Sequence, residues 1–167
     1  MAVSTFTYTR THTSAFVADQ MRSHLIRIVQ AAGLSPQLLV DDWEVLGRAT
    51  RAWLESGHLK MVKIEFYKPG SNVLQLRWDF PISYEGSGVD DDMWVDRQHL
   101  QRTIDKVGRP PTGCTYRILL TPAPGHPHVD GMGDATALPT TGLVSRATGT
   151  AIATHDITAG INYWRPA

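Results

Sequence analysis

The segment PGHPHVDGMGD, residues 124 to 134, holds the residues whose types and spacing come nearest to a chemical site. His126 and His128 are two positions apart, and Asp130 follows two positions later. Two imidazoles and a carboxylate at this spacing can bind zinc from an extended chain, which would support a small metal-dependent hydrolase. Pro127 and the neighbouring glycines form a poor rigid scaffold, however, and no H-E-x-x-H or cysteine motif accompanies them. We interpret the segment as a loop that binds no metal, with the hydrolase as the alternative.

Other candidate groups predict chemistry less well. The acidic run Asp90, Asp91 and Asp92 lacks the alternating spacing and closing glutamate of a calcium loop. It is more typical of a solvated turn or of charge at a helix N-terminus. Cys114 precedes an apolar run and is predicted to pack as a small apolar residue. No P-loop, dinucleotide fingerprint or G-x-S-x-G occurs, so the motifs predict no cofactor and no catalytic constellation.

Composition sets the broad class of the protein. The chain has 167 residues, which suits one domain, and its 16 basic and 16 acidic residues give no net charge. Such a balance gives no electrostatic support for direct nucleic-acid binding. The single cysteine cannot form an intramolecular disulfide, and no stretch is apolar enough to be a signal peptide or a membrane span. We therefore expect a cytoplasmic protein without membrane contact.

Three segments have helical periodicity. Ser14 resembles an N-cap, and apolar residues follow at helical spacing until Gly33 ends the run. A second helix is predicted to begin at Ser35 and Pro36 and to end at Gly57. A third is predicted over roughly residues 96 to 107. The predicted buried stripes are Val17, Met21, Leu25, Ile28 and Ala32; Leu39, Trp43, Leu46, Thr50 and Trp53; and Leu100, Ile104 and Val107.

The strand signals lie between and after these helices. The stretches KMVKIEFY and VLQLRWDFPI alternate apolar and polar residues, and Pro69 and Gly70 supply a turn between them. This pattern predicts a hairpin with one buried face and one solvated face, the latter carrying Glu65, Arg77 and Asp79. Residues 114 to 120, CTYRILL, predict another strand.

Both ends of the chain have a less regular pattern. Residues 4 to 13, STFTYTRTHT, alternate threonine or serine with larger residues, which predicts a strand or an extended arm. Residues 122 to 145 are rich in proline and glycine, and a long irregular segment in a compact domain is usually functional or disordered. Two short strand-like pieces, GTAIAT and GINYWR, follow. The pair Tyr163 and Trp164 argues against a disordered end, so we expect this strand to dock on the domain.

Six segments together resemble bacterial HORMA domain proteins, which are relatives of the eukaryotic spindle-checkpoint and meiotic HORMA proteins. They are YTRTHTSAFVADQM, WLESGHLKMVKIEFYKPGSNVLQLRWDFPI, MWVDRQHL, YRILLTPAPGHPHVDGM, GLVSRATGT and YWR, in that order along nearly the whole chain. The resemblance implies an α+β fold of three helices packed on a mostly antiparallel sheet. It also implies one HORMA domain over residues 1–167. Its parts would be an N-terminal arm at 1–13, a core at 14–121 and a mobile C-terminal safety belt at 122–167.

The resemblance further implies a non-enzymatic adaptor. In such a domain the belt closes over a short closure-motif peptide that comes from a partner or from another copy. Relatives of this bacterial type are associated with anti-phage CBASS signalling, where they activate a cGAS-like (DncV-like) nucleotidyltransferase. A Trip13-like AAA+ ATPase reopens them.

Three sets of residues are expected to carry these roles. The peptide is expected to add to the edge of the strand formed by Thr115, Tyr116, Arg117, Ile118, Leu119 and Leu120. Ile152, Ile161, Tyr163 and Trp164 are expected to dock the belt. Phe6, Tyr8 and Arg10 would form the handle that the ATPase grips, or else a closure motif for another copy. A structural or toxin-neutralising partner without any switch stays open as a third hypothesis.

Overall fold

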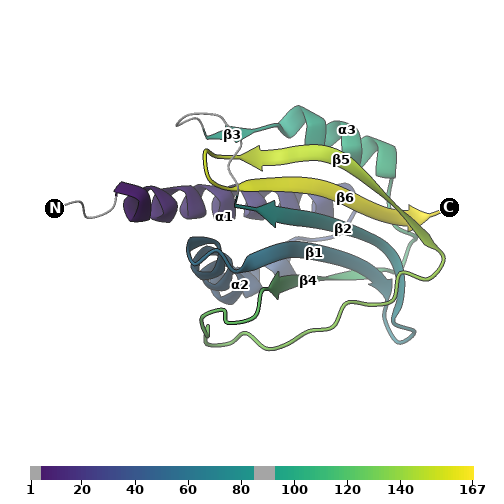
Figure 1. The fold of residues 1–167 in the computed structure, drawn as a ribbon. Helices are drawn as coiled ribbons and strands as arrows, with labels where there is room; N and C mark the ends of the chain where they lie inside the picture. Colours follow the sequence, from purple (N-terminus) through teal and green to yellow (C-terminus); the bar gives the residue numbers. More distant parts are fainter. Residues whose placement is uncertain (1–4, 85–92) are drawn as a thin grey trace.

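The computed structural model describes residues 5–84 and 93–167. It consists of three helices that cover one face of a six-stranded antiparallel sheet, which confirms the predicted fold class (Figure 1). The elements in chain order are α1 (Thr5–Ala31), α2 (Gln37–Glu55), β1 (Leu59–Lys68), β2 (Val73–Ser83), β3 (Trp94–Val95), α3 (Arg97–Val107), β4 (Thr115–Pro122), β5 (Leu143–Ala153) and β6 (Thr158–Pro166). In these described ranges no helix is both long and apolar enough to cross a membrane.

The second and third helices begin where the sequence predicts. The Ser35 hydroxyl accepts a hydrogen bond from the Gln37 amide at 3.2 Å, next to the first turn of α2. The Asp96 carboxylate accepts one from the His99 amide at 2.8 Å and so caps α3. Both side chains satisfy amides that have no partner within the helix, which stabilises the helix start.

The first helix begins earlier than predicted. The extended conformation expected for residues 4 to 13 is wrong over residues 5–13, which are the first part of α1. Ser14 lies inside this helix, where its hydroxyl donates to the Arg10 carbonyl at 2.6 Å, and it is therefore not an N-cap. Thr13 and Ser14 are fully buried. Tertiary packing of this turn outweighs the low helix propensity of its threonines. The acidic run 90–92 lies outside the described residues.

The sheet has the order β3-β5-β6-β2-β1-β4. The predicted hairpin is β1 and β2, and Gly70 in its turn has φ +87°, a conformation that favours glycine. Side chains that point toward the helices form the core, with Ile64 and Phe66 from β1 and Trp78 and Phe80 from β2 buried there. The C-terminal strand β6 lies between β5 and β2, while β4 forms one end of the sheet.

The face of β1 and β2 that was predicted to be solvated is buried where its charges lie. Glu65 is fully buried, and Arg77 and Asp79 are only 6% and 3% exposed. Arg77 Nε pairs with the Asp79 carboxylate at 2.9 Å, and Arg117 Nε on β4 pairs with Glu65 at 2.8 Å. Trp164 Nε1 on β6 donates to Asp79 at 2.9 Å. The prediction is wrong because distant parts of the chain cover this face and supply partners for its charges.

Candidate functional site

The edge of β4 that faces away from β1 is free of any other described strand. Such an edge carries backbone N–H and C=O groups without partners in the sheet. The chain leaves β4 at Pro122 and reaches β5 only at Leu143. In Figure 1 this connection, residues 123–142, runs alongside β4 for its whole length. The edge is thus neither paired within the sheet nor openly exposed to solvent.

The first half of the connection is held by α2. The Trp53 indole donates to the Pro127 carbonyl at 2.7 Å, and the Arg48 guanidinium donates to the Asp130 carbonyl at 3.2 Å. Val129 is buried in the core, and its carbonyl accepts from the Met132 amide at 3.1 Å in a tight turn. These contacts place residues 127–132 on the helical side of the sheet.

The second half of the connection is held on the opposite face of the sheet. Arg117 Nη2 donates to the Thr136 carbonyl at 2.7 Å, and the Leu138 amide donates to the buried Glu65 carboxylate at 2.9 Å. The chain therefore crosses from one face to the other, round the β4 edge, between residues 132 and 136. Over the described residues, no backbone hydrogen bond joins residues 124–142 to β4. The connection encloses the edge without occupying its hydrogen-bonding positions.

Two cavities lie along this enclosed edge. The larger, of about 360 Å³, lies between α2 and the start of β4. The smaller, of about 130 Å³, lies beside the end of β4. Met132 lines both cavities. Together the cavities and the free edge form a channel that suits an extended peptide, because an added strand needs backbone partners and spaces for alternate side chains.

The six residues predicted to bind a peptide all lie on β4, and their role stays a prediction. Tyr116, Arg117 and Ile118 line the larger cavity and Leu120 lines the smaller. Thr115 and Leu119 line neither cavity. The Tyr116 hydroxyl accepts from the Leu39 amide at 3.1 Å and donates to the Ser35 carbonyl at 2.9 Å, so it fixes α2 against β4. Burial raises the pKa of this hydroxyl.

Sequence reasoning missed the other wall of the channel, which α2 supplies. Leu38, Asp41, Asp42, Glu44 and Val45 line the larger cavity from this helix. The stripe Leu39, Leu46 and Trp53 was correctly predicted to be a helical face, but nothing local shows that it packs along β4. The sequence offered one signal, because Leu38 is a large apolar residue outside the predicted buried stripe. In the structure its side chain is 48% exposed and lines the cavity.

The histidine segment lies at the smaller cavity. The His126 ring packs edge-on against Trp53 with a centroid distance of 4.8 Å. His128 Nε2 lies 3.1 Å from the Asp130 carboxylate, and both of these side chains are exposed. Among the described residues, no three side chains of the types that bind metals come together to hold an ion.

The β5–β6 hairpin carries the residues that were predicted to dock the belt. Ile152, Ile161 and Tyr163 are buried, and Trp164 is half-buried between β5 and β2. The Arg77 guanidinium lies 5.1 Å from the centre of the Trp164 ring. The hairpin is thus held in the sheet on both edges and by its side chains, while a docking role for these residues stays a prediction.

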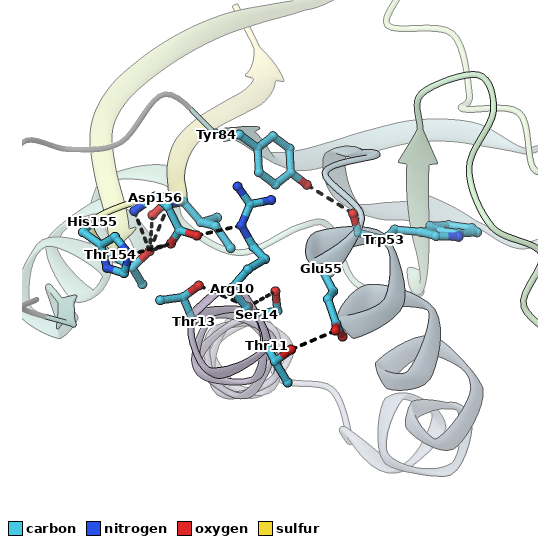
Figure 2. A network of polar contacts seen from close by, with 11 residues as sticks. Arg10, Thr11, Thr13, Ser14, Trp53, Glu55, Tyr84, Thr154, His155 and Asp156 are labelled. Atoms are coloured by element: carbon cyan, nitrogen blue, oxygen red, sulfur yellow. Dashed lines mark hydrogen bonds and ion pairs between the residues drawn. The ribbon is translucent and has the colours of Figure 1, made fainter. Parts of the chain in front are cut away.

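A polar network ties the start of α1 to the turn of this hairpin (Figure 2). Arg10 Nε contacts the Asp156 carboxylate at 2.6 Å, and the two side chains are 13% and 8% exposed. Thr154 in the same turn donates to Asp156 at 3.0 Å. The Arg10 guanidinium also lies 5.2 Å from the centre of the Tyr84 ring. We name the Arg10–Asp156 ion pair the latch.

Electrostatics favour a charged latch. Burial alone would raise the pKa of Asp156, but hydrogen bonds from Arg10, Thr13 and Thr154 outweigh it and lower the pKa below its ordinary value. Arg10 was predicted to be part of a remodeller handle together with Phe6 and Tyr8. All three residues lie on α1, and the structure describes the side chain of Arg10 but not those of Phe6 and Tyr8. The handle role stays a prediction.

This fold and the enclosed sheet edge are those of a HORMA domain. The family model described as Bacterial HORMA domain 2 matches residues 1–167, so the chain belongs to that family. The family is one of binding and adaptor domains, and none of the comparisons indicates a catalytic family. A comparison with curated protein sequences found no match.

Solved structures share the fold at low sequence identity. A chain of the mitotic checkpoint complex is 12% identical with a TM-score of 0.67, covering 95% of this chain and 99% of that one. A chain of the E. coli MS115-1 CdnC:HORMA-deltaN complex is 15% identical with a TM-score of 0.65, covering 94% and 89%. C. elegans HTP-2 bound to HTP-3 closure motif 1 is 17% identical with a TM-score of 0.53, covering 72% and 64%.

Proposed function

We propose that this chain is a non-enzymatic signalling adaptor that captures an extended closure-motif peptide at the free edge of β4. The peptide would form a seventh strand beneath residues 123–142, which act as the strap of a safety belt that extends over residues 122–167. The observation that carries the proposal is the enclosed edge, whose backbone groups have no partner in the sheet although the connection passes round it.

The enclosing geometry accounts for a slow release. A strand that is bound through backbone hydrogen bonds alone gains modest affinity and dissociates readily. Here the strap is held by Arg117 and Glu65 on one face and by Trp53 on the other, so the peptide leaves only when these contacts break. Release is then limited by undocking of the belt rather than by the size of the interface.

We further propose that the closed domain binds and activates a cGAS-like nucleotidyltransferase in cytoplasmic anti-phage defence. The structural likeness to the E. coli CdnC:HORMA-deltaN complex supports this partner, and that to HTP-2 bound to a closure motif supports the peptide. A Trip13-like AAA+ ATPase would reset the domain by pulling the first residues of α1. The latch supports this step, because unwinding α1 at Arg10 removes one partner of Asp156 in the β5–β6 turn.

Peptide selection followed by dissociation kinetics tests the proposal. The full chain is used to select binders from random dodecapeptides displayed on phage, and release of a synthetic selected peptide is then timed. Trp164→Ala removes the hydrogen bond to Asp79 and part of the packing of β6. If undocking limits release, a loss of ~1.4 kcal/mol of docking energy speeds release about tenfold. Val73→Ala, at an exposed position of β2 outside the part that pairs with β6, is the control and leaves release unchanged.

Two results would contradict the proposal. Failure to select any peptide would rule out peptide binding at the β4 edge. Unchanged release from a correctly folded Trp164→Ala variant would rule out the strap.

A further inference from the structure

The larger cavity of the channel has an apolar floor and an acidic rim. Leu39, Leu46, Ile118 and Met132 contribute apolar surface. Asp41, Asp42 and Glu44, which lie within about one turn of α2, line the same cavity. These three residues are exposed, and the cavity that they line is also lined by β4, where the proposed peptide would add.

The negative charge of this rim is not neutralised within the described part of the chain. None of the three carboxylates forms an ion pair there, and Asp41 only accepts a hydrogen bond from Gln37 at 2.6 Å. One cation, Arg117, lines the cavity, but it is paired with the buried Glu65. The Arg48 guanidinium nearby donates to the Asp130 carbonyl.

The negative potential extends to the floor of the cavity. Burial is the main cause that raises the pKa of the Tyr116 hydroxyl, and the charges of Asp42 and Asp41 raise it further. The carboxylates therefore act across the cavity from α2 to β4. A cationic side chain with a long apolar stem fits such a site, because its stem covers apolar surface while its head remains at the rim.

Resting on the proposed function, we infer that the closure motif of this protein carries a lysine or arginine that enters the larger cavity and meets Asp42 and Glu44. A second, smaller apolar side chain of the motif enters the smaller cavity beside Trp53 and Leu120. From β4, the larger cavity is lined by Tyr116, Arg117 and Ile118, and the smaller by Leu120, Thr121 and Pro122, so corresponding positions are about four residues apart. At ~3.3 Å per strand residue the two side chains lie about four positions apart in the motif, on one face of the added strand.

Selection with charge-reversed variants tests this inference. The dodecapeptide library is applied in parallel to the wild type, to Asp42→Lys/Glu44→Lys, and to the control Asp19→Lys/Asp105→Lys. The control reverses two exposed carboxylates on α1 and α3, so both variants change the net charge equally. Wild type and control are expected to select peptides with an aligned basic residue and an apolar residue about four positions away. The rim variant loses the basic preference and binds the wild-type peptides about tenfold or more weakly at low salt.

The outcomes separate this inference from the proposed function. Peptides that bind the wild type without a basic preference, or that bind the rim variant equally well, would overturn the inference while leaving peptide binding intact. A basic preference that the control variant also loses would assign it to overall charge and would overturn the inference too. Recovery of no peptide from the wild type would contradict the proposed function itself.

Discussion

Replacing Asp156 by asparagine tests how strongly the latch holds the β5–β6 turn. Asparagine keeps the size of the side chain and an oxygen that can accept from Thr154, but it removes the charge that faces Arg10. Both partners of the latch are largely buried, with 13% and 8% of their side chains exposed. Removing one partner of a buried pair costs ~3–5 kcal/mol, because it leaves the other charge poorly compensated. Since Arg10 also contacts the Tyr84 ring, we expect a loss near the lower end, about 3 kcal/mol.

Urea unfolding of five proteins measures this effect. Asp156→Asn, Arg10→Met and the double variant form a cycle with the wild type, and Asp105→Asn on the exposed face of α3 is the control. The control is expected to change the free energy of unfolding by less than ~0.5 kcal/mol. The double variant is expected to be more stable than the sum of the single effects predicts, by about 1 to 3 kcal/mol.

The pH dependence adds a second test of the latch. The pKa of Asp156 is lowered in the fold, so the carboxylate stays charged below its ordinary pKa of 3.8. Its contribution is complete above that pH and is lost as the pH falls further. A loss below ~0.5 kcal/mol in Asp156→Asn, or strict additivity in the cycle, would refute the reasoning about the latch.

Three further predictions concern other parts of the chain. Burial is the main cause that lowers the pKa of His24 from 6.5 to about 4, and the charges of Arg97 and Arg27 add to it. As the pH falls from 6.5 to about 4, we therefore expect the free energy of unfolding, measured with urea, to decrease by up to ~3 kcal/mol. This pH dependence is expected to vanish in His24→Leu. Elemental analysis of the purified chain is expected to find no stoichiometric zinc, and one tightly bound ion per chain would instead support the hydrolase. His128→Ala is expected to cost less than ~0.5 kcal/mol and His126→Ala about 1 kcal/mol, because only the His126 ring packs on Trp53. Deleting residues 2–10 is expected to abolish ATP-driven reopening by the proposed Trip13-like ATPase, with Arg10→Met, which breaks the latch alone, as the control. Equally fast reopening of the deleted form would exclude the handle, while a loss of self-association would favour the closure-motif alternative.

Local sequence patterns correctly predict most helices and strands of this fold, but they predict less well which polar side chains are buried. The alternation in KMVKIEFY and VLQLRWDFPI correctly predicts β1 and β2, since a strand with one buried face has a period of two residues. The same alternation misplaces Glu65, Arg77 and Asp79 in solvent. Their burial depends on Trp164 and on residues 136–138, which no local pattern connects to this face.

The candidate site could be predicted only in part for a similar reason. An apolar strand followed by a long irregular segment correctly indicated where the chain leaves the sheet. The acidic residues of α2 gave no such signal, because charges on a helix are usually a solvated face. Only the packing of α2 along β4, fixed by the Tyr116 hydroxyl, turns Asp42 and Glu44 toward a cavity. Likewise, the helical start of α1 depends on a partner in the last quarter of the chain, Asp156.

The position of β6 has a consequence for how the protein is made. The last strand of the chain lies in the middle of the sheet, where it joins β5 and β3 to the hairpin β1–β2. During synthesis from the N-terminus, the edge of β2 that pairs with β6 has no partner until β6 emerges from the ribosome. Each newly made chain therefore passes through a state in which residues 123–142 do not yet enclose the edge of β4. On the proposed function, a closure-motif peptide present at that moment would be enclosed during folding, without any energy-consuming step to open the domain beforehand.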